Sequence, residues 1–270
     1  MNAPTDLAAV KGKQQIAWSS GDYAVIGTTL QIVGEQLAEA AELNWDEDVL
    51  DVAAGNGNAT LAAARRGCRV TSTDYVSTLL DNGSERAHAE RLNVTFKVAD
   101  VEALPFEDKS FDAVLSTFGV MFAPDHAASA REMARVCRSG GRIALANWTP
   151  DSLVGKLFKA IGKQVPPAPG VQPPSLWGTE LHLRTLFGDV ASKIEINPRA
   201  FNFRYRSAKH FIEVFRTWYG PVLKTFAALP AEKAAALERD LTELLNGLNK
   251  RGADALVVPS EYLEVIITRR

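Results

Sequence analysis

The 270-residue sequence contains few cysteines and no long apolar segment. Its two cysteines, Cys68 and Cys137, do not have the spacing of a metal-binding motif, so we expect two free thiols. No apolar run approaches the roughly 18 residues of a membrane span. The segment from Met1 to Asp6 also lacks the charged start and apolar core of a signal peptide. We therefore expect a cytoplasmic protein with no membrane span and no metal site.

A concentration of positive charge is also missing. The sequence has 30 Lys and Arg residues and 32 Asp and Glu residues, which gives a formal net charge of −2 at pH 7. Nucleic-acid-binding proteins present a basic stripe, so a nucleic-acid partner is not expected. The apolar fraction of 46% is enough for one large core with an appendage. These features predict one domain, residues 1–270, that acts on a small molecule, and they leave the oligomeric state open.

The most informative segment present is a glycine loop that reads VLDVAAGNGN from Val49 to Asn58. Its apolar start is typical of a buried parallel strand, and residues 59–66 favour a following helix. Glycines let the backbone approach a ligand closely, and the first turn of the helix offers unpaired N–H groups. The same residues would also suit a plain strand-to-helix turn without a ligand.

Asp51, just before this loop, helps to decide which ligand the loop binds. Its charge would repel the pyrophosphate of a dinucleotide but would attract a ligand with an ammonium group. The third glycine of the dinucleotide fingerprint is absent, because Gly55 and Gly57 are followed by Ala59 and Thr60. The loop therefore favours S-adenosylmethionine over the nicotinamide cofactor of an oxidoreductase.

Two further predicted strands are followed by acidic residues. Residues 68–75 predict a strand with an acid, Asp74, near its end, at the distance from the loop where parallel folds place a ribose-binding carboxylate. The strand Val94–Val98 precedes the segment ADVEALPFEDKSFD, which begins at Ala99. With the loop, this combination resembles the class I S-adenosylmethionine-dependent methyltransferases, type 11 branch, which includes ubiquinone and menaquinone biosynthetic enzymes. The resemblance runs from about Val49 to Trp148.

The resemblance implies an α/β fold, a Rossmann-like doubly wound sheet of seven strands in the order 3-2-1-4-5-7-6. Helices would cover both faces, with a helical cap above one end. The last two strands would lie in residues 194–205 and 262–268, the final one antiparallel. Ala53 stands where many members have glycine, so we expect it at negative φ or in an altered loop path. The pair Gly140-Gly141 would come just before the fifth strand.

The resemblance also implies an enzyme that uses S-adenosylmethionine and releases S-adenosylhomocysteine. The loop at Gly55 and Gly57 would lie beneath the methionine part, Asp74 would bind the ribose hydroxyls, and Asp100 would take the adenine amino group. The N–H of Val101 would reach the adenine ring. The remaining residues that we expect around the cofactor are Trp18, Tyr23, Asp51, Ala53, Asn56, Tyr75, Glu102, Ser116 and Thr117.

Residues 1–44 are predicted to form an N-terminal helical arm. An apolar stripe made of Ile26, Leu30, Val33 and Leu37 indicates a helix that runs to about Leu43 and packs on the sheet. Two aromatic residues precede it. In similar methyltransferases such a segment folds over the cofactor, but Trp18 and Tyr23 would equally serve to pack the arm onto the domain.

The cofactor-binding core is expected in residues 45–148, a substrate-side elaboration and cap in 149–261, and the final strand in 262–270. Residues 153–162 favour a helix, and the proline-rich segment 165–174 favours a stiff loop. Two apolar stripes, in 211–226 and 237–248, predict two packed helices whose side chains form core or pocket wall. The predicted substrate-pocket residues are Trp177, His182 and Trp218.

The chemistry expected is methyl transfer, for which alignment of the two reactants supplies much of the rate. An acceptor that is a phenol, a hydroxyl or an acidic carbon would gain from a general base. We expect a phenolic, quinone-like, polyketide or isoprenoid acceptor, without distinguishing O-, C- or N-methylation. A non-catalytic S-adenosylmethionine sensor is the alternative. Candidate bases are His126, which follows the helix-capping Asp125 and is otherwise simply exposed, and His182, His210, Tyr23 and Tyr219.

Overall fold

A computed structural model describes residues 6–270, which form a seven-stranded sheet with the order β3-β2-β1-β4-β5-β7-β6. The predicted strand order is therefore confirmed. Strands β1 to β5 run parallel, and β7 pairs antiparallel with both β5 and β6. The strand bounds are β1 Asp48–Val52, β2 Arg69–Asp74, β3 Val94–Val98, β4 Phe111–Thr117, β5 Cys137–Trp148, β6 Ala191–Tyr205 and β7 Leu256–Arg269.

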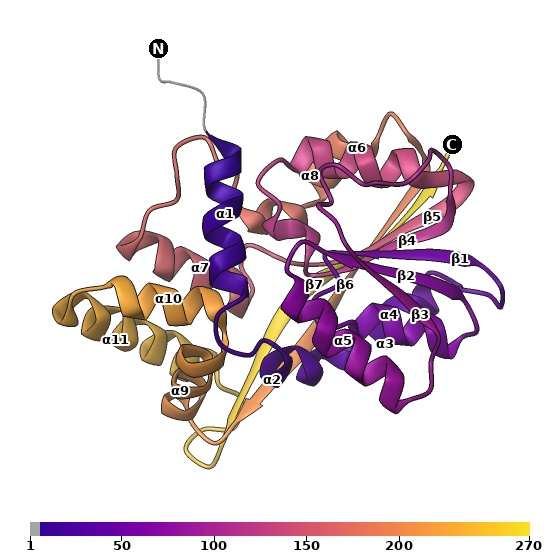
Figure 1. The fold of residues 1–270 in the computed structure, drawn as a ribbon. Coiled ribbons are helices and arrows are strands. Elements are labelled where there is room, and N and C mark those ends of the chain that lie inside the picture. Colours follow the sequence, from indigo (N-terminus) through magenta and orange to yellow (C-terminus); the bar gives the residue numbers. More distant parts are fainter. Residues whose placement is uncertain (1–5) are drawn as a thin grey trace.

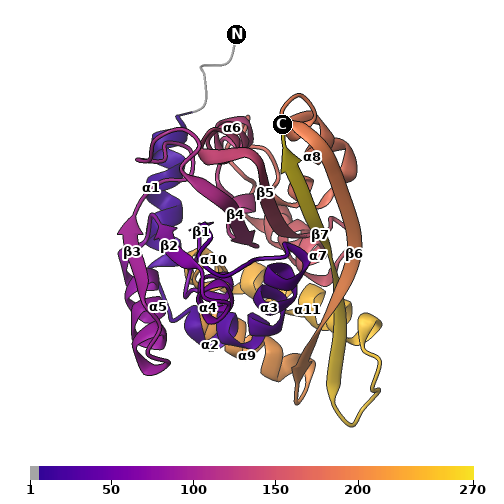
Figure 2. The ribbon, with the colours of Figure 1, turned by 90° about the vertical axis from the view of Figure 1, so that its right-hand side faces the viewer.

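Helices cover both faces of this sheet (Figure 1). One face carries α3 (Gln31–Ala40), α4 (Asn58–Arg65) and α5 (Ser77–Ala89), and the other carries α6 (His126–Val136) and α8 (Glu180–Phe187). The central strands are apolar on both sides for this reason, as expected for parallel strands between two helical layers. Figure 2 shows the strand order from β3 at one edge to β6 at the other.

The N-terminal arm is more divided than the sequence indicated. Its apolar stripe is buried as predicted, but the helix is split into α2 (Ala24–Gly27), a short 3₁₀ turn (Thr28–Leu30) and α3. A further helix, α1 (Leu7–Trp18), precedes them and contains no fully buried residue. No apolar stripe marks α1, so periodicity could not predict it. Residues 1–5 of the predicted arm lie outside the described residues.

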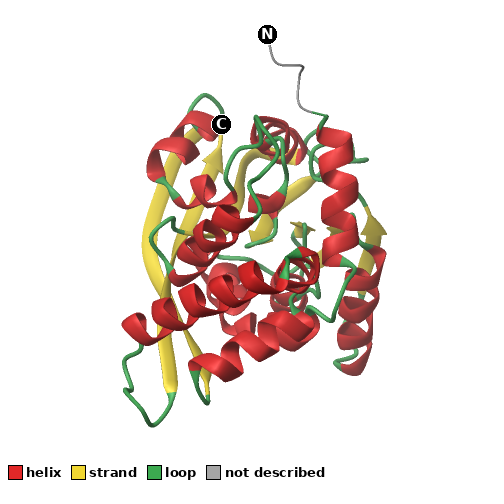
Figure 3. Cartoon of the chain, turned by 90° about the vertical axis from the view of Figure 1, so that its left-hand side faces the viewer, coloured by secondary structure: helices red, strands yellow, loops and turns green. Residues whose placement is uncertain are grey.

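The cap stands at one end of the sheet, beside α1, and Figure 3 shows these helices in front of the strands. The stripe predicted in 211–226 as one helix is divided between two, because Tyr219 is extended and Pro221 lies in the first turn of a new helix. The β6–β7 ribbon supports the cap, and β7 begins at Leu256 rather than Tyr262. The cap elements are α7 (Leu153–Gln164), the 3₁₀ turn Pro174–Gly178, α9 (Ala208–Trp218), α10 (Gly220–Ala228) and α11 (Ala231–Leu248).

Of two smaller expectations, the one about the cysteines is met and the one about the glycine pair is not. Cys68 and Cys137 are free thiols, both buried. The glycine pair at Gly140 lies inside β5, which already starts at Cys137, rather than before the strand. Between residues 6 and 270, no helix combines the length and the apolarity that crossing a bilayer requires.

The contact between α3 and α4 yields a stability prediction. A Cβ atom on Gly34 would lie 2.7 Å from the backbone carbonyl of Asn58, whereas one on Gly162, also helical, would meet nothing within 4 Å. Overpacking costs about 1–3 kcal/mol, so Gly34→Ala should lower the free energy of unfolding. Gly162→Ala should raise it by about 0.5–1 kcal/mol through helix propensity. Urea unfolding measures both, and equal effects would contradict the packing described.

Candidate functional site

A cavity opens where the parallel strands end, between the sheet, α1 and the cap. It contains about 1200 Å³ of space, its open mouth included. The lining comes from the segments after β1, β2, β3 and β4 and from the arm and the cap. Such a crevice outside the carboxyl ends of the strands is the usual ligand site of open α/β sheets.

The glycine loop forms the floor of this cavity in a left-handed conformation. The φ angles are +57° at Gly55 and +83° at Gly57, where glycine is suited. Ala53 has φ +49°, which rules out the negative φ that was one of the two expectations for this residue. Its carbonyl is held directly against the backbone of Gly119, after β4, which fixes the path of the loop. The left-handed alanine costs about 1–2 kcal/mol.

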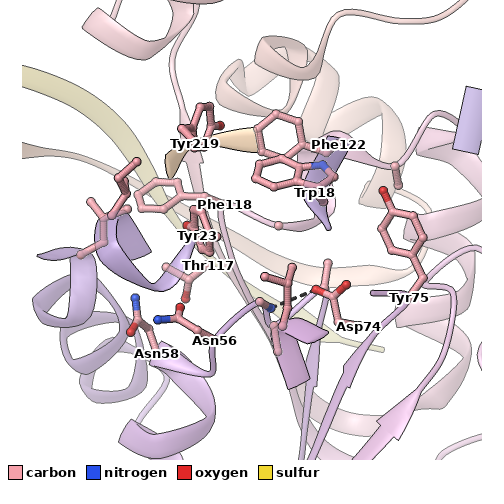
Figure 4. Close-up of a pocket in the computed structure, with 18 of the residues that line it drawn as sticks. Trp18, Tyr23, Asn56, Asn58, Asp74, Tyr75, Thr117, Phe118, Phe122 and Tyr219 are labelled. Carbon is pink, nitrogen blue, oxygen red and sulfur yellow. Dashed lines mark hydrogen bonds between the residues drawn. The ribbon is translucent and has the colours of Figure 1, made fainter. Parts of the chain in front are cut away.

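Asp74, at the end of β2, has its carboxylate in the cavity wall. Its Oδ2 accepts a hydrogen bond from the Gly55 N–H at 2.9 Å (Figure 4). Its Oδ1 accepts one from the Val76 N–H, also at 2.9 Å. Burial raises the pKa of Asp74 to about 6, although these N–H groups act in the opposite direction. The site therefore holds a pre-positioned carboxylate that ionises close to neutral pH.

Asp51 does not line the cavity, contrary to its predicted role beside the ligand. Its Oδ2 accepts hydrogen bonds from the N–H and the hydroxyl of Thr60, at 2.8 and 2.6 Å. The carboxylate therefore satisfies the first turn of α4, which has no side-chain cap of its own. Burial, and further the charge of Asp74, raise the pKa of Asp51 to about 7.

At the far end of the floor, Asp100 and Val101 line the cavity beside α1. The ammonium of Lys11 lies 2.5 Å from Asp100 Oδ2 and also pairs with Glu102. Glu102 itself does not line the cavity, because its Oε1 accepts the N–H of Asp125. Sequence reasoning missed Lys11, since a single lysine in an unmarked helix carries no motif.

The opposite end of the cavity is aromatic. Trp18 makes edge-on contacts with Tyr23, Phe122 and Tyr219, with ring centroids 4.9–5.7 Å apart (Figure 4). Another wall begins at Phe118, whose ring stacks on Trp148 at 3.9 Å. The side chains of Val154, Leu157, Phe203 and Phe215, from the cap and β6, complete the lining.

The arm and the cap meet at this aromatic end. Gly21 forms a bridge with Tyr219, and the N–H of Asp22 donates to the carbonyl of Trp218 at 3.1 Å. A side chain on Gly220 would collide with the carbonyl of Ala17, so the two backbones touch. The roof over the cavity is therefore built jointly by residues far apart in the sequence.

The three predicted substrate-pocket residues lie elsewhere and have to be corrected. Trp177 is fully buried and packs on His126, whose Nδ1 lies 2.9 Å from His182 Nε2. This pair joins α6 to α8, away from the cavity, and His126 is buried rather than exposed. Burial, and further His182, lower the pKa of His126 to about 4. Trp218 is 41% exposed and is not among the residues that line the cavity.

Most of the residues expected around a cofactor do come together. Gly57 and Ser116 support the wall from behind, and the Ser116 hydroxyl donates to Val52 O and accepts from Val120 N. Of the candidate bases, only Tyr23 and Tyr219 face the cavity. The predicted residues that line it are Trp18, Tyr23, Ala53, Gly55, Asn56, Asp74, Tyr75, Asp100, Val101 and Thr117.

The segment that forms the cavity floor also matches known proteins. Residues 50–145 match a family described as a methyltransferase domain. An uncharacterized protein of Mycobacterium tuberculosis is 39% identical over 232 residues, 84% of this chain and 85% of that protein. A demethylmenaquinone methyltransferase of Mycolicibacterium vanbaalenii is 36% identical over 171 residues, 63% of this chain and 64% of that one.

The fold has relatives among solved structures. The crystal structure of the YcgJ protein from Bacillus subtilis matches with a TM-score of 0.61 and 18% identity, over 90% of this chain and 99% of that one. The family match covers the strands and loops that form the cavity floor, from β1 to β5. The chain therefore belongs to the class I S-adenosylmethionine-dependent methyltransferases, with S-adenosylmethionine as its cofactor.

Proposed function

We propose that this methyltransferase acts on a small, largely apolar acceptor. The observation that carries the proposal is one continuous cavity with a charged end and an aromatic end. When bound, the cofactor supplies a methyl group that its sulfonium already activates. The chain then has to align the acceptor with that methyl group and exclude water, and positioning of this kind contributes about 7–11 kcal/mol.

The charged end fits S-adenosylmethionine. Asp74 presents a carboxylate to the ribose hydroxyls, and the left-handed loop at Gly55 leaves room for a close ligand under Tyr23. The buried hydroxyl of Tyr75 has no hydrogen-bond partner among the described residues, so it is available to the nucleoside. We assign the cofactor to these residues together with Asn56, Asp100, Val101 and Thr117.

Lys11 gives α1 a part in cofactor binding. We infer that the adenine amino group binds to Asp100 in place of Lys11, while the Lys11 ammonium keeps its contact with Glu102. Two neighbouring side chains, Gln14 and Gln15, donate to the carbonyls of Phe122 and Tyr75 at 3.0 and 3.1 Å. Because these contacts are polar and α1 buries no residue fully, the part of α1 that carries them is suited to move aside and return, whereas Trp18 at its end is packed on aromatic rings.

The aromatic end suits a phenolic, quinone-like, polyketide or isoprenoid acceptor. The division proposed from sequence, with residues 45–148 for the cofactor and 149–261 for the acceptor, needs the arm as a third contributor. Trp18, Tyr23 and Phe122 lie at the acceptor end although they precede residue 149. The direct test is formation of S-adenosylhomocysteine from S-adenosylmethionine with a panel of such acceptors, and turnover also excludes the non-catalytic sensor.

Asp74→Ala should weaken the binding of S-adenosylhomocysteine at least about tenfold. Hydrogen bonds to a charged group contribute about 1.5–3 kcal/mol each, and the variant removes the acceptor of the ribose hydroxyls. Asp81→Ala, on the exposed side of α5, is the matched control and should bind like the unaltered protein. Calorimetry on both folded variants measures this. Equal affinity for Asp74→Ala and the control would remove Asp74 from the site.

Affinity and stability should change in opposite directions with pH. Asp74 and Asp51 have pKa values of about 6 and about 7, above the usual 3.8 of an unfolded chain. Their contribution to stability is therefore fully present below about pH 3.8 and is lost as pH rises from there through about 6 to 7. Cofactor affinity should rise in the same range, because the ionised carboxylate is the better acceptor.

Thermal unfolding and calorimetry across this range give the two curves. Asp74→Asn, which does not titrate, should flatten the affinity curve. Affinity that stays level from about pH 5 to about pH 8 in the unaltered protein would contradict the assigned role of Asp74.

Phe215→Leu should change the choice among acceptors without changing cofactor affinity. Phe215 lines the aromatic end, whereas Trp218, one turn further along α9, does not. A change of pocket shape by one apolar group alters the ratio of kcat/KM values by about 10- to 200-fold. Trp218→Leu is the control and should leave that ratio in place. An effect of Trp218→Leu as large as that of Phe215→Leu would place the acceptor elsewhere.

A further inference from the structure

We propose that the acceptor is bound as an oxyanion, an ionised phenol or enol, whose oxygen is held by the hydroxyls of Tyr23 and Tyr219. This inference rests on the proposed function and specifies its substrate class. It also means that the protein aligns an acceptor that is already deprotonated and does not itself remove the proton.

The two hydroxyls are the central observation. Both tyrosines line the cavity, with ring centroids 6.2 Å apart. Neither hydroxyl has a hydrogen-bond partner within residues 6–270, and neither is buried in the protein, so both are open to a ligand in the cavity. The aromatic end therefore offers neutral donors to a ligand oxygen.

Among the described residues, none at the aromatic end can serve as a general base. The charged residues that line the cavity are Lys11, Asp74 and Asp100, all engaged in ion pairs or backbone hydrogen bonds, and of these it is Asp74 whose charge acts on Tyr23. The tyrosines stay protonated. Burial, and further the charge of Asp74, raise the pKa of Tyr23 to about 12, and burial, with Tyr23, raises the pKa of Tyr219 well above its usual value.

The energetics favour an anion only when the cofactor is present. An isolated charge in an apolar pocket is strongly unfavourable. The positive charge of the bound cofactor and two hydroxyl donors offset that cost, because hydrogen bonds to an anion are about twice as strong as neutral ones. We therefore expect the acceptor to bind after S-adenosylmethionine.

The charges balance in the transfer itself. The acceptor uses an electron pair of its ionised oxygen, or of the conjugated enolate carbon, to form the bond to the methyl carbon. The sulfur–methyl bond breaks, and its electron pair stays on sulfur. The negative charge of the acceptor and the positive charge of the cofactor disappear together, so O-methylation leaves no proton to remove. Methylation at a ring carbon leaves one proton, which passes to solvent when the product rearomatises.

Binding of para-nitrophenol tests the inference, because its ionised form absorbs in the visible range. The probe is added to protein saturated with S-adenosylmethionine and, separately, with S-adenosylhomocysteine, which lacks the positive charge of the sulfonium. We expect the pKa of the bound probe to fall with the charged cofactor and not with the neutral product. The less acidic para-cresol and the non-ionisable para-nitroanisole should bind at least tenfold more weakly.

Variants assign the effect to the two hydroxyls. Tyr219→Phe and Tyr23→Phe should each weaken the phenolate at least tenfold and leave para-nitroanisole unchanged. Tyr205→Phe is the matched control, because Tyr205 packs on Phe211 and Phe215 outside the cavity lining.

The inference is overturned if the probe binds in its neutral form, if it fails to bind, or if both cofactor forms act alike. Failure of the proposed function shows itself separately, as absence of turnover with every acceptor in the panel while both cofactor forms bind.

Discussion

The hydrogen bond between the Gly55 N–H and the buried carboxylate of Asp74 is the contact on which the cofactor end depends. It joins the loop after β1 to the end of β2 and keeps that loop in its left-handed path. The carboxylate is consequently fixed before any ligand arrives, and the same hydrogen bond opposes the rise in its pKa that burial causes. A site arranged in this way does not have to order its main acceptor on binding, and pre-organisation of that kind is a general source of affinity.

The roof depends on a different constraint, which is backbone contact between segments about 200 positions apart. Gly21 lies against Trp218, and Gly220 lies against Ala17, so the arm and the α9–α10 junction close on each other with no side chains between them. These contacts bring Trp18, Tyr23 and Tyr219 together above the glycine loop. The cofactor floor is thus made by contiguous strands and loops, while the acceptor end depends on long-range pairing.

This difference explains what the sequence could and could not predict. The strand order, the loop and Asp74 follow from local patterns of apolar runs, glycines and acids, and the structure confirms the order and places Asp74 in the cavity wall. Local patterns could not show that Asp51 caps α4, because that depends on which N–H groups the fold turns toward it. They also misplaced Trp177, His182 and Trp218, since an aromatic residue in a cap sequence carries no signal of which face it occupies. The roles of Lys11 and of the pair Tyr23 and Tyr219 could not be predicted either, because they depend on how the arm packs on the rest of the domain.

The electrostatics of the two ends are coupled through the cofactor. The described lining holds its carboxylates and its one ammonium at the nucleoside end, and the aromatic end holds neutral hydroxyls and ring faces. A positive charge placed between them is therefore the strongest field that an acceptor would feel, because the low-dielectric ring walls screen it little. Specificity for charge then belongs to the protein–cofactor complex rather than to the protein alone. The ring walls select shape, and the loaded cofactor selects an ionised acceptor over a neutral one of the same shape.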